Sequence, residues 1–168
     1  GRKDDDQSTK AFRGKGAGES MTKVQVISKT GRLGETHSLN IIGGSKKPDV
    51  CRFVLNQLVA KCDQSKIPDI YTTENMKAEE VQVQMVVWFP LFDGQWAITE
   101  VSKEDPDLCF GYACVLNGCG ELGYFRFTDI AEYASACGIS PVVEDYTRGK
   151  GDTLAGIREE IEFIEEVA

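Results

Sequence analysis

The stretch from residue 79 to residue 127 constrains the fold more than any other part of the chain. It holds both tryptophans and three of the six cysteines. Apolar residues alternate with glutamines at its start, in the sequence EEVQVQMVVWFP. Period-two alternation rich in β-branched residues is typical of a strand with one buried face. The stretch therefore predicts a β-sheet that the rest of the chain covers or extends.

Turn signals divide this stretch into four strands. Asp93-Gly94 separates two apolar runs, and glycine tolerates the positive φ of a tight hairpin turn. A charged segment with Pro106 indicates a loop, and Asn117-Gly118 turns the chain again. Trp96 follows the first turn in a patterned strand, so we expect it in the core. The prediction is an antiparallel meander with strands near 81–90, 96–101, 108–116 and 122–127.

The flanking segments predict a hairpin and three helices. The hairpin is expected from two short apolar segments at 23–29 and 36–42. Apolar residues at helical spacing follow Pro48, follow the N-cap candidate Thr128, and follow Asp152. The helices are expected at 48–62, from Thr128 to a C-terminal Gly138, and at 152–167.

These elements define an α+β fold. We expect an antiparallel sheet of about six strands, the N-terminal hairpin plus the four-strand meander, with three helices packed on one face. Residues 1–20 are rich in Gly, Lys and Asp and are expected to be a mobile tail or a leader foreign to the natural chain. Residues 21–168 are expected to form a single α+β domain.

The charge of the chain excludes some classes of partner. The formal net charge is −8, which disfavours direct binding to nucleic acid and to an anionic membrane surface. No apolar run approaches the roughly 20 residues of a membrane span, and no signal sequence precedes Met21. We therefore expect a cytoplasmic location and reduced cysteine thiols.

Several segments together resemble a known family. They are IPDIYTTE (67–74), VQVQMVVWFP (81–90), WAITE (96–100), CFGYACVLNG (109–118), ELGYFRFTDI (121–130) and PVVEDY (141–146). Over residues 67–146 they resemble the bacterial domain of unknown function 2958 family, which is associated with plasmids, phages and other mobile elements. The most specific parts are the ELGYF segment followed by an acidic helix start and the aromatic-x-x-TE strand of WAITE. An aromatic-rich strand usually follows VVED in the family, whereas RGKGDT stands here. The family has no established activity, so the resemblance implies a fold and a genomic setting.

Candidate catalytic chemistry rests on two carboxylates in the family-like segments. Glu100 and Glu121, with Tyr124, could perform acid–base chemistry if burial separated their pKa values. Alternatively, both are surface charges, with Arg126 as a partner for one of them. His37 is the only histidine, and nothing in the sequence places a nucleophile beside it.

Metal and cofactor motifs are not apparent. Cys109, Cys114 and Cys119 are spaced five apart, without the close pairs of structural zinc sites. The glycine-rich segments at 14–18 and 148–153 lack the order of a phosphate-binding loop. We expect no metal and no cofactor.

The last predicted helix is crowded with acids. Like charges four residues apart destabilise a helix, so local stability does not explain them. Either they serve solubility or they contact a partner with a basic surface. The residues proposed to bind that partner are Glu159, Glu160, Glu162, Glu165 and Glu166.

The leading interpretation is a small acidic protein of mobile elements that acts by binding another protein and not by catalysis. One alternative is a DNA mimic or anti-defence protein, in which the acidic helix imitates phosphates. The other alternative is an enzyme that uses Glu100, Glu121 and Tyr124.

Overall fold

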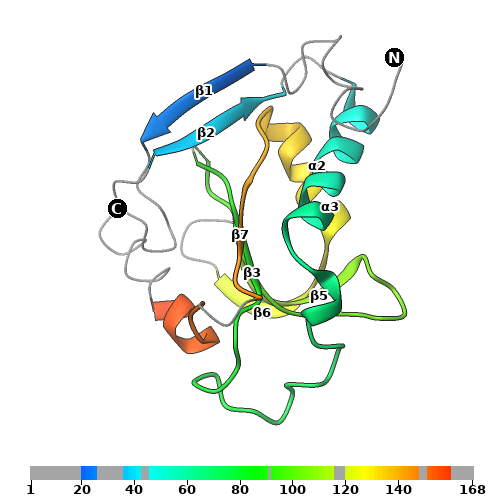
Figure 1. The fold of residues 1–168 in the computed structure, drawn as a ribbon, viewed down its shortest axis with the longest axis vertical. Coiled ribbons are helices and arrows are strands. Elements are labelled where there is room, and N and C mark those ends of the chain that lie inside the picture. The colour runs from blue at the N-terminus through cyan, green and yellow to red at the C-terminus, as the bar shows by residue number, and fades with distance from the viewer. Residues whose placement is uncertain are drawn as a thin grey trace.

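The computed structural model describes residues 20–25, 36–42, 46–90, 92–115, 120–147 and 151–159. An antiparallel sheet forms its centre (Figure 1). It has five strands in the order β6-β5-β4-β3-β7. Its strands are β3 (Met85–Trp88), β4 (Gln95–Val101), β5 (Leu108–Cys114), β6 (Gly120–Arg126) and β7 (Val142–Asp145).

The predicted four-strand meander is confirmed. Strands β3 to β6 pair antiparallel with their neighbours in chain order. The first turn contains Gly94 with φ of 127°, a conformation that glycine adopts without steric cost. Residues 81–84 precede β3 instead of extending it, although Val81 and Val83 are buried.

The N-terminal hairpin does not join this sheet, so the prediction of one six-stranded sheet was wrong. Strands β1 (Ser20–Gln25) and β2 (Thr36–Ile41) pair only with each other in the described part of the chain. The fifth strand of the main sheet is β7, which pairs along all four residues of β3. Because β7 occupies that edge, β3 has no free side for the hairpin.

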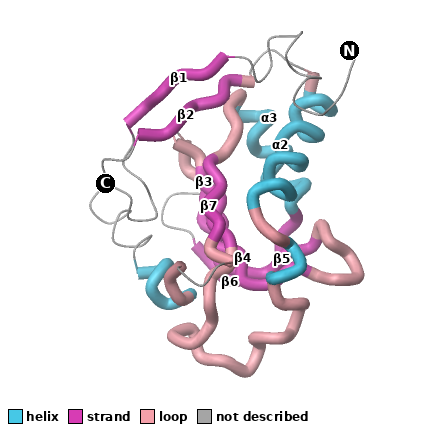
Figure 2. The backbone as a smooth tube through the Cα atoms, viewed as in Figure 1, coloured by secondary structure: helices cyan, strands magenta, loops and turns pink. Residues whose placement is uncertain are grey.

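Two long helices cover one face of the sheet, called here the helix face (Figure 2). They are α2 (Lys47–Lys61) and α3 (Phe127–Cys137), and they pack against each other. A short 3-10 helix, η1 (Gln64–Lys66), follows α2. The core between the helices and the sheet includes Trp96, which is buried as predicted and makes edge-on ring contacts with Phe89 and Tyr133.

A third helix lies on the opposite side of the sheet, called here the outer face. Residues 154–159 are helical, and the rest of the predicted last helix lies outside the described residues. Leu154 and Ile157 pack against outward residues of the sheet such as Val86 and Tyr112. The expectation that all three helices share one face was therefore wrong. Strands β3 and β4 are buried on both faces, so the sheet needs cover on both sides.

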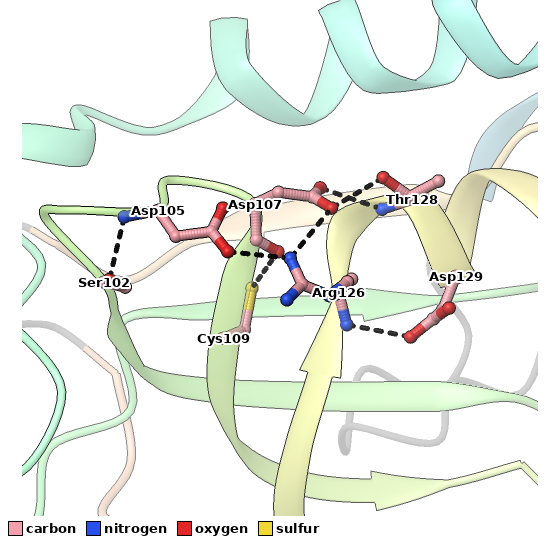
Figure 3. A network of polar contacts seen from close by, with 7 residues as sticks. All are labelled: Ser102, Asp105, Asp107, Cys109, Arg126, Thr128 and Asp129. Atoms are coloured by element: carbon pink, nitrogen blue, oxygen red, sulfur yellow. Dashed lines mark hydrogen bonds and ion pairs between the residues drawn. The ribbon is translucent and has the colours of Figure 1, made fainter.

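The start of α3 is held by the loop before β5 (Figure 3). The carboxylate of Asp107 accepts hydrogen bonds from the Thr128 backbone N–H at 3.1 Å and from its hydroxyl at 2.7 Å. The Asp107 carbonyl accepts from the Phe127 N–H. Because α3 begins at Phe127, the prediction of Thr128 as N-cap was wrong. The predicted C-terminal Gly138 is confirmed, with φ of 78°.

A cavity on the outer face of the sheet

A cavity of about 310 Å³ opens on the outer face of the sheet. Strands β4, β5 and β6 form its base, and its walls come from the loop at 71–78, from Val81 and from the third helix. The lining residues are Tyr71, Thr73, Glu74, Met76, Ala78, Val81, Thr99, Glu100, Phe110, Leu122, Tyr124 and Leu154.

Large apolar side chains that remain exposed gather at this cavity. The described chain exposes six of them, and four line the cavity: Tyr71, Met76, Leu122 and Tyr124. Tyr71 is 64% exposed and Tyr124 is 52% exposed. Single exposed apolar residues are ordinary, but a contiguous group of them marks an interaction site. We call these four residues the apolar rim.

A β-bulge places Glu100 in this cavity. In β4, Trp96 and Ile98 point to the helix face, and regular alternation would send Glu100 the same way. The pairing with β5 shifts between Ile98 and Glu100, so that Glu100 lies opposite Phe110, an outer-face residue. An extra residue in a strand redirects the side chains that follow it. The bulge therefore turns Glu100 from the core toward the cavity.

The Glu100 carboxylate holds the loop that forms one wall. Its Oε1 accepts from the Tyr71 backbone N–H at 3.0 Å, and its Oε2 accepts from the Thr73 N–H at 2.7 Å and from the Thr73 hydroxyl at 2.6 Å. Glu100 is only 3% exposed, so these donors replace the water it loses. Tyr71 has φ of 74°, a conformation that costs free energy for a bulky residue and tends to mark functional sites.

Tyr124 stands opposite this loop, on β6. A hydrogen bond with the Tyr71 side chain raises the pKa of Tyr124 above its usual value, and the charges of Glu100 and Glu74 raise this pKa further. The ring of Tyr124 meets the Phe110 ring edge-on, with centroids 5.1 Å apart. The cavity is therefore bounded by aromatic rings and by the carboxylates of Glu74 and Glu100.

The structure does not bring Glu121 to Glu100. Successive side chains of β6 alternate between faces, so Leu122 and Tyr124 point outward while Glu121 points to the helix face. Glu121 is exposed and lines a separate cavity of about 290 Å³ beside α3. Arg126 pairs with neither glutamate. Its Nη1 lies 2.9 Å from Asp105 and 3.7 Å from Asp107.

The other predicted site residues are only partly described. Glu159 is exposed at the end of the described third helix. The remaining acids proposed to bind a partner, Glu160, Glu162, Glu165 and Glu166, lie outside the described residues. His37 belongs to β2, and its side chain is also outside the description.

The described cysteines do not form a metal-binding cluster. Cys109 and Cys114 lie on opposite faces of the sheet, and Cys119 is outside the described residues. Five described cysteines are free thiols, and burial raises the pKa of the Cys109 thiol far above its usual value. Within the described part of the chain, no three His, Cys, Asp or Glu residues are arranged to hold a metal ion.

Sequence reasoning identified Glu100 and Tyr124 but missed most of the cavity. The missed residues include Tyr71, Met76, Phe110 and Leu122. One signal was present, since Leu122 and Tyr124 alternate with Glu121 and Gly123, which predicts one apolar face on β6. The loop at 71–78 carries no periodic pattern that could have placed it above the sheet.

The fold and the cavity define an α+β protein with an antiparallel sheet covered on both faces and an aromatic-lined cavity on one of them. The chain belongs to the family described as "Protein of unknown function (DUF2958)", whose model matches residues 57–154. This match confirms the resemblance over residues 67–146 and includes every residue that lines the cavity. No curated protein and no solved structure matches the chain. No helix among the described residues is long and apolar enough to cross a membrane.

Proposed function

We propose that this protein acts by binding another protein, and that the partner contacts the cavity and its apolar rim. One observation carries the proposal. Of the six large apolar side chains exposed in the described chain, four surround a single cavity. Protein interfaces are built around such a centre of aromatic and aliphatic side chains with a polar surround.

The edge position of β6 supports a partner that binds as an extended segment. Among the described strands, β6 pairs only with β5. The Phe127 N–H donates to the Asp107 carbonyl, which continues the antiparallel ladder beyond β6. Because hydrogen-bonding groups alternate along a strand, the N–H groups of Leu122 and Tyr124 then point away from β5. An extended chain could pair with this edge and place side chains at the cavity.

The environment of Glu100 supports binding over catalysis. Three donors already occupy most of the acceptor capacity of its carboxylate, and they hold a loop. A general base needs that capacity for a substrate proton. Glu121, its proposed catalytic partner, points to the other face of the sheet. Glu100 is better suited to positioning Tyr71 than to proton transfer.

The overall charge supports a partner with a basic surface. The net charge of −8 would accelerate encounter with a cationic protein, mainly through the association rate. The acids beyond Glu159 in the last segment of the chain add to this field. On the family resemblance, we place this binding role among proteins of plasmids and phages.

Site-specific photo-crosslinking in cells tests the proposal, because it captures a partner whose identity is unknown. A benzophenone amino acid replaces Tyr124 in the apolar rim, and in a second variant it replaces Phe92, an exposed aromatic residue outside the cavity. We expect discrete crosslinked protein bands from position 124 that are absent from position 92.

A second pair of variants controls for nonspecific capture. Leu122→Ser in the crosslinking background should abolish the bands, because it removes apolar contact at the rim. Val59→Ser, at another exposed apolar residue, should leave them unchanged. The same bands from both crosslinking positions, or bands that survive Leu122→Ser, would refute a partner site at the cavity.

A further inference from the structure

We infer that the cavity binds an arginine side chain of the partner, with the guanidinium between the aromatic rings and the carboxylates of Glu74 and Glu100. This inference rests on the proposed function, which it deepens by naming the chemistry of the bound segment. It follows from three features of the cavity: its ring surfaces, its charges and the remaining acceptor capacity of Glu100.

The cavity offers aromatic surface to a cation. Tyr71, Phe110 and Tyr124 all line it, and the last two are in edge-on contact. A cation above an aromatic ring is attracted by the negative ring face, and arginine makes such contacts more often than lysine. Arg158 of the third helix already makes one on the same face of the sheet, 5.0 Å from the Tyr112 ring centre. Arg158 does not line the cavity.

The charges that line the cavity are of one sign. Glu74 and Glu100 are the carboxylic acids among the twelve described residues that line it, and that set contains no Lys, Arg or His. The donors to Glu100 come from two backbone N–H groups and one hydroxyl, so its negative charge is not neutralised by them. Charges act more strongly in a partly dry cavity than in water. A cationic side chain is therefore the complementary occupant.

Glu100 can still accept a hydrogen bond. Its Oε2 accepts two of the three bonds and its Oε1 accepts one, whereas a carboxylate oxygen can accept two. A guanidinium can stack on a ring and donate in its own plane to a carboxylate at the same time. The compact ammonium of lysine lacks the planar surface for the first contact. A neutral side chain would leave both carboxylates without a cation.

A titration with capped amino acids tests this chemistry directly. N-acetyl-arginine amide, the neutral isostere N-acetyl-citrulline amide, the lysine analogue and the norleucine analogue are added to the isotope-labelled protein. Backbone NMR shifts are followed at Tyr71, Thr73 and Tyr124. We expect arginine to shift these signals and to bind about tenfold more tightly than citrulline, with lysine between them.

Matched variants locate the contribution of each wall. Glu74→Gln should reduce the preference for arginine over citrulline to about threefold or less, because it removes one of two charges. Tyr124→Leu should weaken arginine binding while keeping an apolar rim. Glu79→Gln, at an exposed acid directly after the loop at 71–78 and outside the cavity lining, is the control and should change neither quantity.

The outcomes separate this inference from the proposed function. Citrulline or norleucine binding as tightly as arginine, or no shifts with arginine at about 50 mM, overturns the inference. Crosslinking from position 124 is independent of that result, so a partner band with no arginine preference leaves the protein-binding proposal intact. Arginine binding without a crosslinked partner overturns the partner proposal instead.

Discussion

Glu100 shows how one side chain can shape the wall of a cavity. It receives two backbone N–H groups from a loop some thirty residues away in the sequence, and it keeps Tyr71 at a positive φ. The free energy of these charge-assisted hydrogen bonds offsets the cost of that backbone conformation. A resemblance in the WAITE segment can draw attention to Glu100, but only the three-dimensional contacts reveal its role.

Replacing Glu100 by Gln is expected to release the loop at 71–73. The Gln side chain is uncharged, and its NH₂ group takes the place of one carboxylate oxygen. At least one hydrogen bond from Tyr71 or Thr73 then loses its acceptor. Hydrogen bonds to charged groups contribute about 1.5–3 kcal/mol, so local protection should fall by about tenfold to a hundredfold. Hydrogen exchange of the Tyr71 and Thr73 amides measures this effect. The control is Glu104→Gln, which removes the same charge from an exposed acid after β4.

If exchange at both amides were unchanged in Glu100→Gln, the charge would not be what holds the loop. The cavity wall would then depend on the packing of Tyr71 against Tyr124. The same variant separates two causes of weaker arginine binding. A released loop would weaken binding of arginine and of the neutral citrulline analogue alike, whereas loss of charge alone would weaken arginine binding only.

At the scale of elements, the sequence predicted what depends on local pattern. The alternation before Pro90, the Asp93-Gly94 turn and the apolar stripe after Pro48 each predicted an element that the structure contains. These signals can be recognised because the side chains on one face of a strand or helix recur in the sequence with a fixed period.

The sequence did not predict what depends on pairing between distant segments. The bulge at Ile98 and Glu100 breaks the alternation without a distinct signal in WAITE, so the inward or outward direction of Glu100 could not be deduced. Strand β7 is four residues long, and its place beside β3 follows from contacts made across more than fifty residues. The cavity wall at 71–78 is held by Glu100, and it was missed for the same reason.

Gly111 is expected to be essential for the bulge. It lies opposite Ile98, and a Cβ added there would come within 1.9 Å of the Ala97 carbonyl oxygen. Gly111→Ala should therefore force β4 and β5 apart and reduce the free energy of unfolding by about 1–3 kcal/mol, in the range of overpacking substitutions. Urea unfolding at neutral pH measures this change.

The matched control is a glycine on the neighbouring strand. Gly123 is the register partner of Gly111 on β6, and a Cβ added there meets nothing within 4 Å. Gly123→Ala should be neutral or slightly stabilising, because it removes freedom from the unfolded chain. An equal loss of stability in both variants would show that strand flexibility, and not the close approach at the bulge, explains the need for glycine.

On the scale of the whole molecule, the cavity marks the place where the second layer of the fold ends. Helices α2 and α3 cover the helix face (Figure 1). The outer face is covered over parts of β3, β4 and β5 by Val81, Val83 and the short third helix. Toward β6 this cover gives way to the loop at 71–78. Apolar side chains of β6, Leu122 and Tyr124, therefore remain exposed there, and Leu154 of the third helix forms the boundary.

The loops beside the sheet also depend on acid side chains that are ionised in the folded state. The Ser65 hydroxyl and backbone lower the pKa of Asp63, the Lys103 and Ile70 backbone N–H groups lower the pKa of Asp69, and Arg126 lowers the pKa of Asp105. A folded-state pKa below the unfolded value means that the unfolded chain binds protons first as the pH falls. The stabilisation is present above about pH 4, the usual pKa of Asp, and is lost below it.

We therefore expect the stability of the protein to decrease as the pH falls from about 5 toward 2, with the steepest change below the usual pKa of Asp. Asp69→Asn tests one contributor, since this residue joins the segment before the cavity wall to the loop after β4 through the Lys103 N–H at 2.9 Å. An amide cannot be protonated in this range, so the variant should be less stable near neutral pH and should lose less stability on acidification. Urea unfolding at intervals between about pH 2 and 7 gives both quantities, with the exposed Glu79→Gln as control. The prediction is contradicted if the free energy of unfolding of Asp69→Asn falls with pH as steeply as that of the unmodified protein. Ionisation of Asp69 would then contribute nothing to stability.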